Sequence, residues 1–328
     1  MNRKQWTNIL KIVVSIILLA FIFMTIDIQA LIITMQNAHP AWLAAALVMM
    51  IIGVVIRAIR WQVLLNALNI RVPIGELTAI YFIGFLFNNL LPSGLGGDAM
   101  RVVELNRHSP RVSDAITSVV VDRFLGLFAL QAIALVALVT NWGTVPNSVA
   151  YFTIAIFIGG LVGGILLINV PLYTSLRRNI GLFRKITDIK FVGNIFESFQ
   201  RYPLPALGQS FVVAFIFNII HIIMYAFIGF AFDAPVSVAQ YAVIVPITSL
   251  LLIIPISFAG LGVREESFRQ LYGQIGVSPE VAVAMALMVY FIGNVCTGLI
   301  GGVIYLLRGA QNVVSEERGA QNVVSEEQ

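Results

Sequence analysis

The chain has 328 residues, of which 59% are hydrophobic and 11% are charged, and its formal net charge is +4. A soluble domain usually carries about 25% charged residues, so this composition excludes a soluble enzyme and a nucleic-acid-binding module and is typical of a polytopic membrane protein. The sequence contains one cysteine, Cys296, and therefore forms no internal disulfide and no cysteine metal cluster.

Six stretches are long and apolar enough to cross a bilayer, which takes about 20 residues of helix. In chain order they are 9–26, 41–65, 116–139, 149–170, 204–232 and 281–307. Tryptophans lie at the ends of these stretches, as expected for a belt of amphipathic rings at the membrane interfaces. They are Trp6, Trp42, Trp61 and Trp142.

Two further apolar stretches are shorter, and each stops at a proline. The first, 77–91, ends before Pro92, and the second, 238–254, ends before Pro255. Each is followed by a glycine-rich turn that contains Gly-Leu-Gly and then by a short charged segment that we expect to be helical. The two turns lie about half the chain apart.

The distribution of lysine and arginine predicts the topology, because these residues concentrate in cytoplasmic loops. The linkers 27–40, 141–148 and 233–237 contain neither residue, so we place them outside. The segment 171–203 carries six cations, so we predict a basic cytoplasmic loop there and a cytoplasmic N-terminus. If both short stretches crossed the bilayer fully, the six-cation segment would lie outside and the rule would be inverted.

This conflict disappears if each short stretch is one arm of a re-entrant helical hairpin. The first hairpin, 77–106, then opens to the cytoplasm, and the second, 238–276, opens to the outside. The predicted fold is all-α, with six full spans and two re-entrant hairpins in one transmembrane domain, 1–307. Its halves, about 8–140 and 149–307, form an inverted repeat of the kind that builds many transporters. The alternative is that the short stretches are thin spans without a repeat.

Charged residues of the first half provide the strongest site candidates. Asp98, Arg101 and Glu104 are spaced three apart, so they share one face of a short helix and can pair. Asp122 and Arg123 lie inside a predicted span, where charges mark function by default and need partners from other elements. We expect Arg101 to pair with Asp122, and Glu104 or Asp98 to pair with Arg123. A structural ion pair is an equally good interpretation of these residues.

Other polar residues have less specific interpretations. In the second hairpin we expect Glu265 to pair with Arg269 and Glu266 to point elsewhere. Asn88 and Asn89 precede the first tip and either bind a head group or satisfy broken backbone, the second being favoured. Arg57 and Arg60 are interpreted as anchors at the end of the second span, and Asn218 as an interhelical hydrogen-bond donor.

Three motifs resemble those of a known family. They are Asn-Leu-Leu-Pro-Ser-Gly-Leu-Gly-Gly-Asp-Ala-Met-Arg at 89–101, Asp-Arg-Phe-Leu-Gly-Leu at 122–127 and Gly-Leu-Gly-Val-Arg-Glu at 260–265. Over about 8–307 the chain resembles the flippase-like transmembrane domain of lysylphosphatidylglycerol synthetases and its stand-alone relatives. The resemblance implies a lipid flippase with re-entrant helices. It maps a glycine–acid–arginine element onto Gly96, Gly97, Asp98 and Arg101, and a late glycine–glutamate element onto Gly260, Gly262 and Glu265.

The sequence departs from this family in two respects. No segment is interpreted as a soluble synthetase domain, so we expect no lysyl transfer to lipid. Residues 256–259 read Ile-Ser-Phe-Ala, where the family commonly places glycines soon after the proline. Both departures leave the transported lipid open.

We therefore expect a flippase-like transporter that moves a phospholipid or a lipid-linked precursor between leaflets of a prokaryotic inner membrane, with both termini cytoplasmic. We expect no catalytic residues, cofactor, metal or nucleic acid, and a disordered tail at 308–328. The alternatives are a non-transporting scaffold that presents lipid to a partner transferase and a small-anion secondary transporter; a homo-oligomer is left open. The predicted substrate-binding residues are Asn89, Gly94, Gly96, Gly97, Asp98, Arg101, Glu104, Asp122, Arg123, Gly260, Gly262, Arg264 and Glu265.

Overall fold

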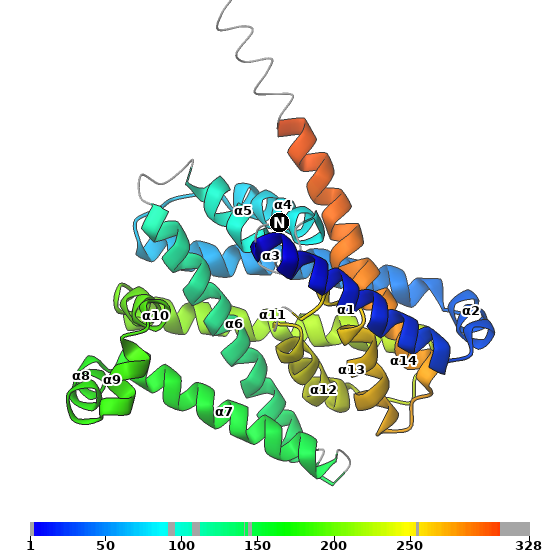
Figure 1. The fold of residues 1–328 in the computed structure, drawn as a ribbon. Helices are drawn as coiled ribbons and strands as arrows, with labels where there is room; N and C mark the ends of the chain where they lie inside the picture. The colour runs from blue at the N-terminus through cyan, green and yellow to red at the C-terminus, as the bar shows by residue number, and fades with distance from the viewer. Residues whose placement is uncertain are drawn as a thin grey trace, which may run out of the picture.

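A computed structural model of the chain describes residues 3–90, 96–106, 112–140, 142–143, 146–253 and 256–308. Helices without any strand make up this described part (Figure 1). Five of the helices are long and apolar enough to cross a membrane, and a sixth span results if a bent helix pair at the N-terminus is counted as one. The prediction of an all-α polytopic membrane protein is confirmed.

Six helices form the first half of the described chain. They are α1 (Arg3–Thr25), α2 (Ile28–Gln36), α3 (Pro40–Ala67), α4 (Ile74–Leu90), α5 (Gly96–Leu105) and α6 (Val112–Thr140). The chain bends by 91° between α1 and α2. Asp27 begins α2 there, because its side chain accepts a hydrogen bond from the backbone amide of Ala30. Pro40 begins α3, at a position where the missing amide proton costs nothing.

The second half of the described chain has eight α-helices. It contains α7 (Asn147–Ile168), α8 (Val170–Asn179), α9 (Gly181–Thr187), α10 (Lys190–Gln200), α11 (Leu204–Ala231), α12 (Val238–Leu251), α13 (Val263–Gly273) and α14 (Pro279–Tyr290). A π-helical turn, Phe291–Cys296, follows α14, and helix continues to Arg308. Both α3 and α11 have 28 residues, and α6 compares with the 30 residues of Pro279–Arg308. The predicted basic loop contains the three short helices α8, α9 and α10.

The two short apolar helices each fold back on the charged helix that follows. Asn88 near the end of α4 accepts a hydrogen bond from the amide of Gly97 at the start of α5, at 2.7 Å. At the opposite ends of these helices, Glu76 and Glu104 both lie beside Arg308. α4 and α5 are therefore antiparallel. α12 and α13 pair in the same way, since the rings of Tyr241 and Tyr272 pack 5.7 Å apart.

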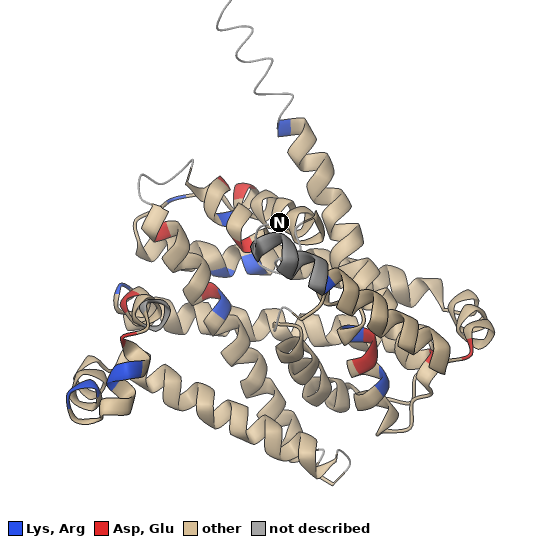
Figure 2. Cartoon of the chain, viewed as in Figure 1, with Lys and Arg blue, Asp and Glu red and all other residues tan. Residues whose placement is uncertain are grey.

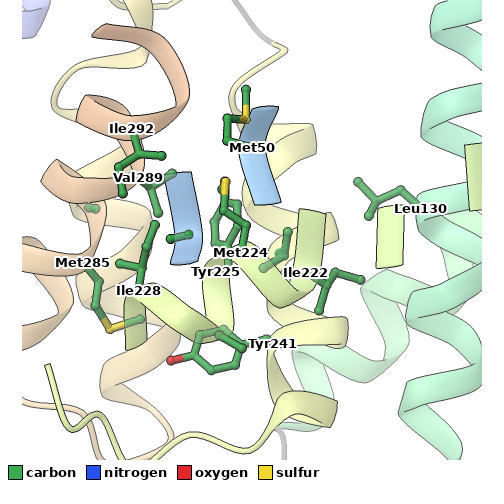
Figure 3. Close-up of a cluster of buried hydrophobic side chains, with 14 of the residues drawn as sticks. Met50, Leu130, Ile222, Met224, Tyr225, Ile228, Tyr241, Met285, Val289 and Ile292 are labelled. Carbon is green, nitrogen blue, oxygen red and sulfur yellow. The ribbon is translucent and has the colours of Figure 1, made fainter. Parts of the chain in front are cut away.

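The core lies where α3 and α11 cross α12 and α14. Figure 3 shows Met50 of α3, Met224 and Ile228 of α11 and Met285 and Val289 of α14 within this buried cluster. Helix α7 lies at the edge of the molecule, and only 6% of its most apolar window is buried (Figure 1). In this arrangement some apolar side chains of each span pack into the core, and the other apolar side chains face lipid.

One tryptophan does not belong to an interfacial belt. Trp61 is fully buried, and its indole Nε1 donates to the hydroxyl of Ser118 at 3.0 Å. The prediction for this residue is wrong, because its side chain points from α3 towards α6. Trp42, in contrast, is 41% exposed at the start of α3.

Candidate functional site

A cavity of about 250 Å³ lies between α3, α4, α5, α6, α11 and α12. Its lining residues on the long helices α3, α6 and α11 lie deep within those helices. Asp122 is ten residues from the start of α6, and His221 is ten residues from the end of α11. At a rise of 1.5 Å per residue, each lies about 15 Å inside its helix. The cavity is therefore near the middle of the predicted membrane-spanning region.

The cavity is unusual in its charge. Four arginines and two aspartates line it, whereas charged residues are sparse along the spanning helices (Figure 2). They are Arg57, Arg60, Arg101, Arg123, Asp98 and Asp122. With His221 counted as neutral, two positive charges are in excess. Charged side chains inside a membrane are costly, so such a cluster marks a functional site by default.

Asp122 lies at the most buried point of this cluster. Its Oδ1 accepts a hydrogen bond from Nε of Arg60 at 2.6 Å. Its Oδ2 accepts from Nη2 of Arg101 at 3.0 Å and from the Tyr81 hydroxyl at 2.9 Å. The predicted pairing of Asp122 with Arg101 is confirmed. Four helices, α3, α4, α5 and α6, are thus joined through one carboxylate.

Asp98 forms a second bridge at the start of α5. Its Oδ1 accepts from Nη1 of Arg101 at 3.3 Å, and its Oδ2 accepts from Nη1 of Arg123 at 2.5 Å. This confirms the pairing of Arg123 with Asp98, one of the two predicted partners. Glu104 lies at the other end of α5, where its Oε2 is 3.8 Å from Nη1 of Arg308. Arg101 therefore binds both aspartates, and its guanidinium packs 4.2 Å from the Trp61 ring.

Arg57 and Arg60 belong to the site, and their interpretation as interfacial anchors is wrong. The helix α3 continues to Ala67, so Arg57 is about 15 Å from its end. Its guanidinium lies 4.2 Å from the ring centroid of Phe217 and 5.6 Å from that of Phe85. The missed signal was the run of apolar residues that follows both arginines, because it places them inside the span.

The asparagines serve the backbone and the helix contacts. Asn88 lines the cavity and caps the amide of Gly97, while Asn89 donates to the carbonyl oxygen of Asn294 in the π-helical turn at 2.7 Å. The preferred interpretation, satisfaction of broken backbone, agrees with both contacts. Asn218 donates to the carbonyl of Gly126 at 2.9 Å, which confirms the predicted interhelical bond.

The second glycine motif lies outside the cavity. Gly260 and Gly262 have φ angles of +76° and +83°, a region that favours glycine. The amide of Gly262 donates to Oε2 of Glu265 at 2.5 Å, and the guanidinium of Arg264 lies 4.9 Å from the ring centroid of Tyr290. The second hairpin contributes Ser249 of α12 to the cavity instead.

One predicted pair in this hairpin is wrong. Arg269 binds Glu266, with its Nε 2.8 Å from Oε2 and its Nη2 2.7 Å from Oε1. Glu265 is unavailable because its side chain turns back to the start of α13, where it satisfies the amide of Gly262. The sequence contains no signal that separates these two neighbouring glutamates.

Of the predicted substrate-binding residues, the structure brings five together around the cavity. They are Gly97, Asp98, Arg101, Asp122 and Arg123. Asn89, Gly96 and Glu104 lie on the first hairpin beside it, and Gly94 lies outside the described residues. Within the described part of the chain, no group of three or more acidic, histidine or cysteine side chains could hold a metal ion.

Sequence comparison finds relatives that match most of this chain. A UPF0104 membrane protein of Methanothermobacter thermautotrophicus is 25% identical over 301 residues, covering 83% of this chain and 87% of that protein. A UPF0104 membrane protein of Pyrococcus horikoshii is 23% identical, covering 90% of this chain and 96% of that protein. The glycosyltransferase AglD of Haloferax volcanii is 24% identical over 92% of this chain, which spans only 54% of that relative.

The family described as the lysylphosphatidylglycerol synthase transmembrane region has a sequence model that matches residues 8–301. This match covers most of the chain and includes every helix that lines the cavity. It confirms the resemblance carried by the three motifs. The chain is therefore a multi-pass membrane protein that belongs to the family of the lysylphosphatidylglycerol synthase transmembrane region.

Proposed function

We propose that this protein is a flippase-like transporter that moves a phospholipid or a lipid-linked precursor between the leaflets of a prokaryotic inner membrane. The carrying observation is a positively charged, partly open cavity at mid-depth, lined by helices that are otherwise apolar. Arginine guanidinium groups bind phosphate well, since their donors match its oxygens. The same cavity gives a phosphate-bearing head group a polar stopping point between the two membrane surfaces.

The two antiparallel helix pairs support this proposal. α4 with α5 and α12 with α13 occupy matching positions in the two halves, each after a 28-residue helix. In our proposal both are re-entrant hairpins, and the halves form an inverted repeat. Short, glycine- and proline-interrupted segments in matching positions are typical of transporter binding sites. Both termini then lie in the cytoplasm.

Accessibility labelling tests this topology. Cysteines are introduced at residues 113 and 276, in place of Ser113 and Gly276, and probed with a membrane-impermeant thiol reagent in cells and in inverted vesicles. The proposed inverted repeat predicts that the two positions lie on opposite sides of the membrane. Labelling of both from the same side would contradict the inverted repeat. The native Cys296 is replaced by alanine in both proteins to remove background labelling.

Translocation by the purified protein tests the function. Proteoliposomes are loaded with a panel of fluorescent lipids, and the fraction that becomes accessible to an external quencher is measured over time. Asp98→Asn and Arg101→Ala break the bridges at the cavity, and we expect both to slow translocation. Asp188→Asn is the matched control, because Asp188 pairs with Arg177 in an exposed contact far from the site in sequence.

The outcomes separate the candidate functions. Unchanged translocation in both cavity variants, at normal protein levels, would refute the site. Uptake of labelled inorganic phosphate without lipid movement would identify a small-anion transporter instead.

A second candidate function is favoured by one comparison. The relative named glycosyltransferase AglD is matched over 54% of its length, so a similar membrane region occurs there in a longer protein. In this alternative the chain presents a lipid to a partner transferase and moves nothing itself. It predicts a transferase that copurifies with the chain in mild detergent, together with no translocation by the pure protein.

A further inference from the structure

If the cavity is the lipid site of the proposed function, the charges that line it determine which head-group charge it binds best. We infer that the site selects a dianionic phosphoryl group, as found in a phosphate monoester or a diphosphate, over the singly charged phosphodiester of an ordinary phospholipid. Four arginines and two aspartates leave an excess of two positive charges. In a low-dielectric setting, the ligand that neutralises this excess is bound most favourably.

The hydrogen bonds show where the excess charge is available. Each aspartate pairs with two arginines. Asp122 binds Arg60 and Arg101, and Asp98 binds Arg101 and Arg123. Arg57, in contrast, has no carboxylate within 4 Å and no hydrogen bond among the described residues, and its contacts are with aromatic rings. Arg57 also lines the cavity. Among the described arginines that line the cavity, Arg57 is therefore the one without a carboxylate partner, and we assign it to the ligand.

The second positive charge lies one helical turn away. Arg60 uses its Nε for Asp122 and also lines the cavity. Because Arg57 and Arg60 are three residues apart, they present their donors on the same face of α3. The start of the ten-residue helix α5 adds the positive end of a helix dipole at Gly97. These groups together form the proposed binding site for one anion.

The ion pairs of Asp98 and Asp122 disfavour a zwitterionic or cationic head group. An amine would need a carboxylate, and both carboxylates that line the cavity are already bound by arginines. The cavity volume of about 250 Å³ lies just below the usual range for sites that enclose a drug-sized ligand. It accommodates a compact phosphoryl group and leaves the hydrocarbon chains outside.

A pair of ligands that differ in a single charge tests this inference. Farnesyl phosphate carries close to two negative charges at pH 8, since the second pKa of a phosphate monoester is about 6, and its methyl ester carries one. Binding of both to the purified full-length protein is measured in detergent by competition. We expect farnesyl phosphate to bind about tenfold more tightly or better, the effect of one charge-assisted hydrogen bond.

Substitution at Arg57 locates the preference. Arg57→Gln is expected to lower the affinity for farnesyl phosphate about tenfold. It should also reduce the difference in affinity between the two ligands, because the excess positive charge of the cavity falls from two to one. Arg57→Lys keeps the charge and should keep the preference. Arg71→Gln is the matched control, since it removes the same charge from an exposed position between α3 and α4.

Equal affinity of the wild-type protein for the two ligands, or an unchanged preference in Arg57→Gln, would overturn the inference. Inorganic phosphate that competes as well as farnesyl phosphate would keep the dianion preference and assign it to free phosphate. The translocation assay is a separate readout. Lipid movement without the dianion preference refutes this inference alone, whereas the preference without lipid movement refutes only the proposed transport.

Discussion

The carboxylate of Asp122 is expected to be the most important single charge for the stability of this protein. Its side chain is 2% exposed and accepts hydrogen bonds from Arg60, Arg101 and Tyr81. Asp122→Asn keeps the shape but removes the negative charge, so both arginines lose their shared partner. Breaking a buried ion pair by removing one partner costs about 3–5 kcal/mol. For a chain of this kind, the apparent melting temperature should fall by about 6–10 °C.

The melting temperature is measured in detergent by the fluorescence of a thiol-reactive dye or by light scattering. Asp98→Asn is the comparison, because Asp98 is 27% exposed and its ion pairs are more screened. We expect it to lower the melting temperature by less than half as much. If Asp122→Asn and Asp98→Asn had equal effects, or if Asp122→Asn had none, the reasoning from buried charge would be refuted.

The remaining predictions concern packing. Gly301→Ala should destabilise the protein by about 1–3 kcal/mol, because the new Cβ would lie 1.9 Å from the main-chain oxygen of Phe82. Gly163→Ala, where nothing lies within 4 Å, should leave the melting temperature almost unchanged. Equal losses of stability in the two variants would contradict the close packing of the helix that contains Gly301 on α4. Trp61→Phe should cost about 1 kcal/mol through the lost bond to Ser118. Adding Ser118→Ala should then cost little more, and fully additive losses in the double variant would show that the bond contributes nothing.

Most of the helical architecture follows from the sequence, because a bilayer imposes a local rule. Each span needs a continuous apolar run of sufficient length, and this property is visible without knowing any neighbour. The predicted stretch 204–232 corresponds to Leu204–Ala231, and 41–65 to Pro40–Ala67. Three ion pairs of the site were also predicted, since Asp98 and Arg101 share a helical face and Asp122 and Arg123 required partners from elsewhere.

Only the tertiary structure decided which of these charges meet and what surrounds them. Arg57 and Arg60 became part of the site because α3 turns that face towards α4, α6 and α11, a choice made by packing between helices far apart in sequence. The same rotation buries Trp61 against Ser118 and removes it from the interface. Helical periodicity places side chains on a common face, but the neighbour of that face is determined by the packing of the whole bundle.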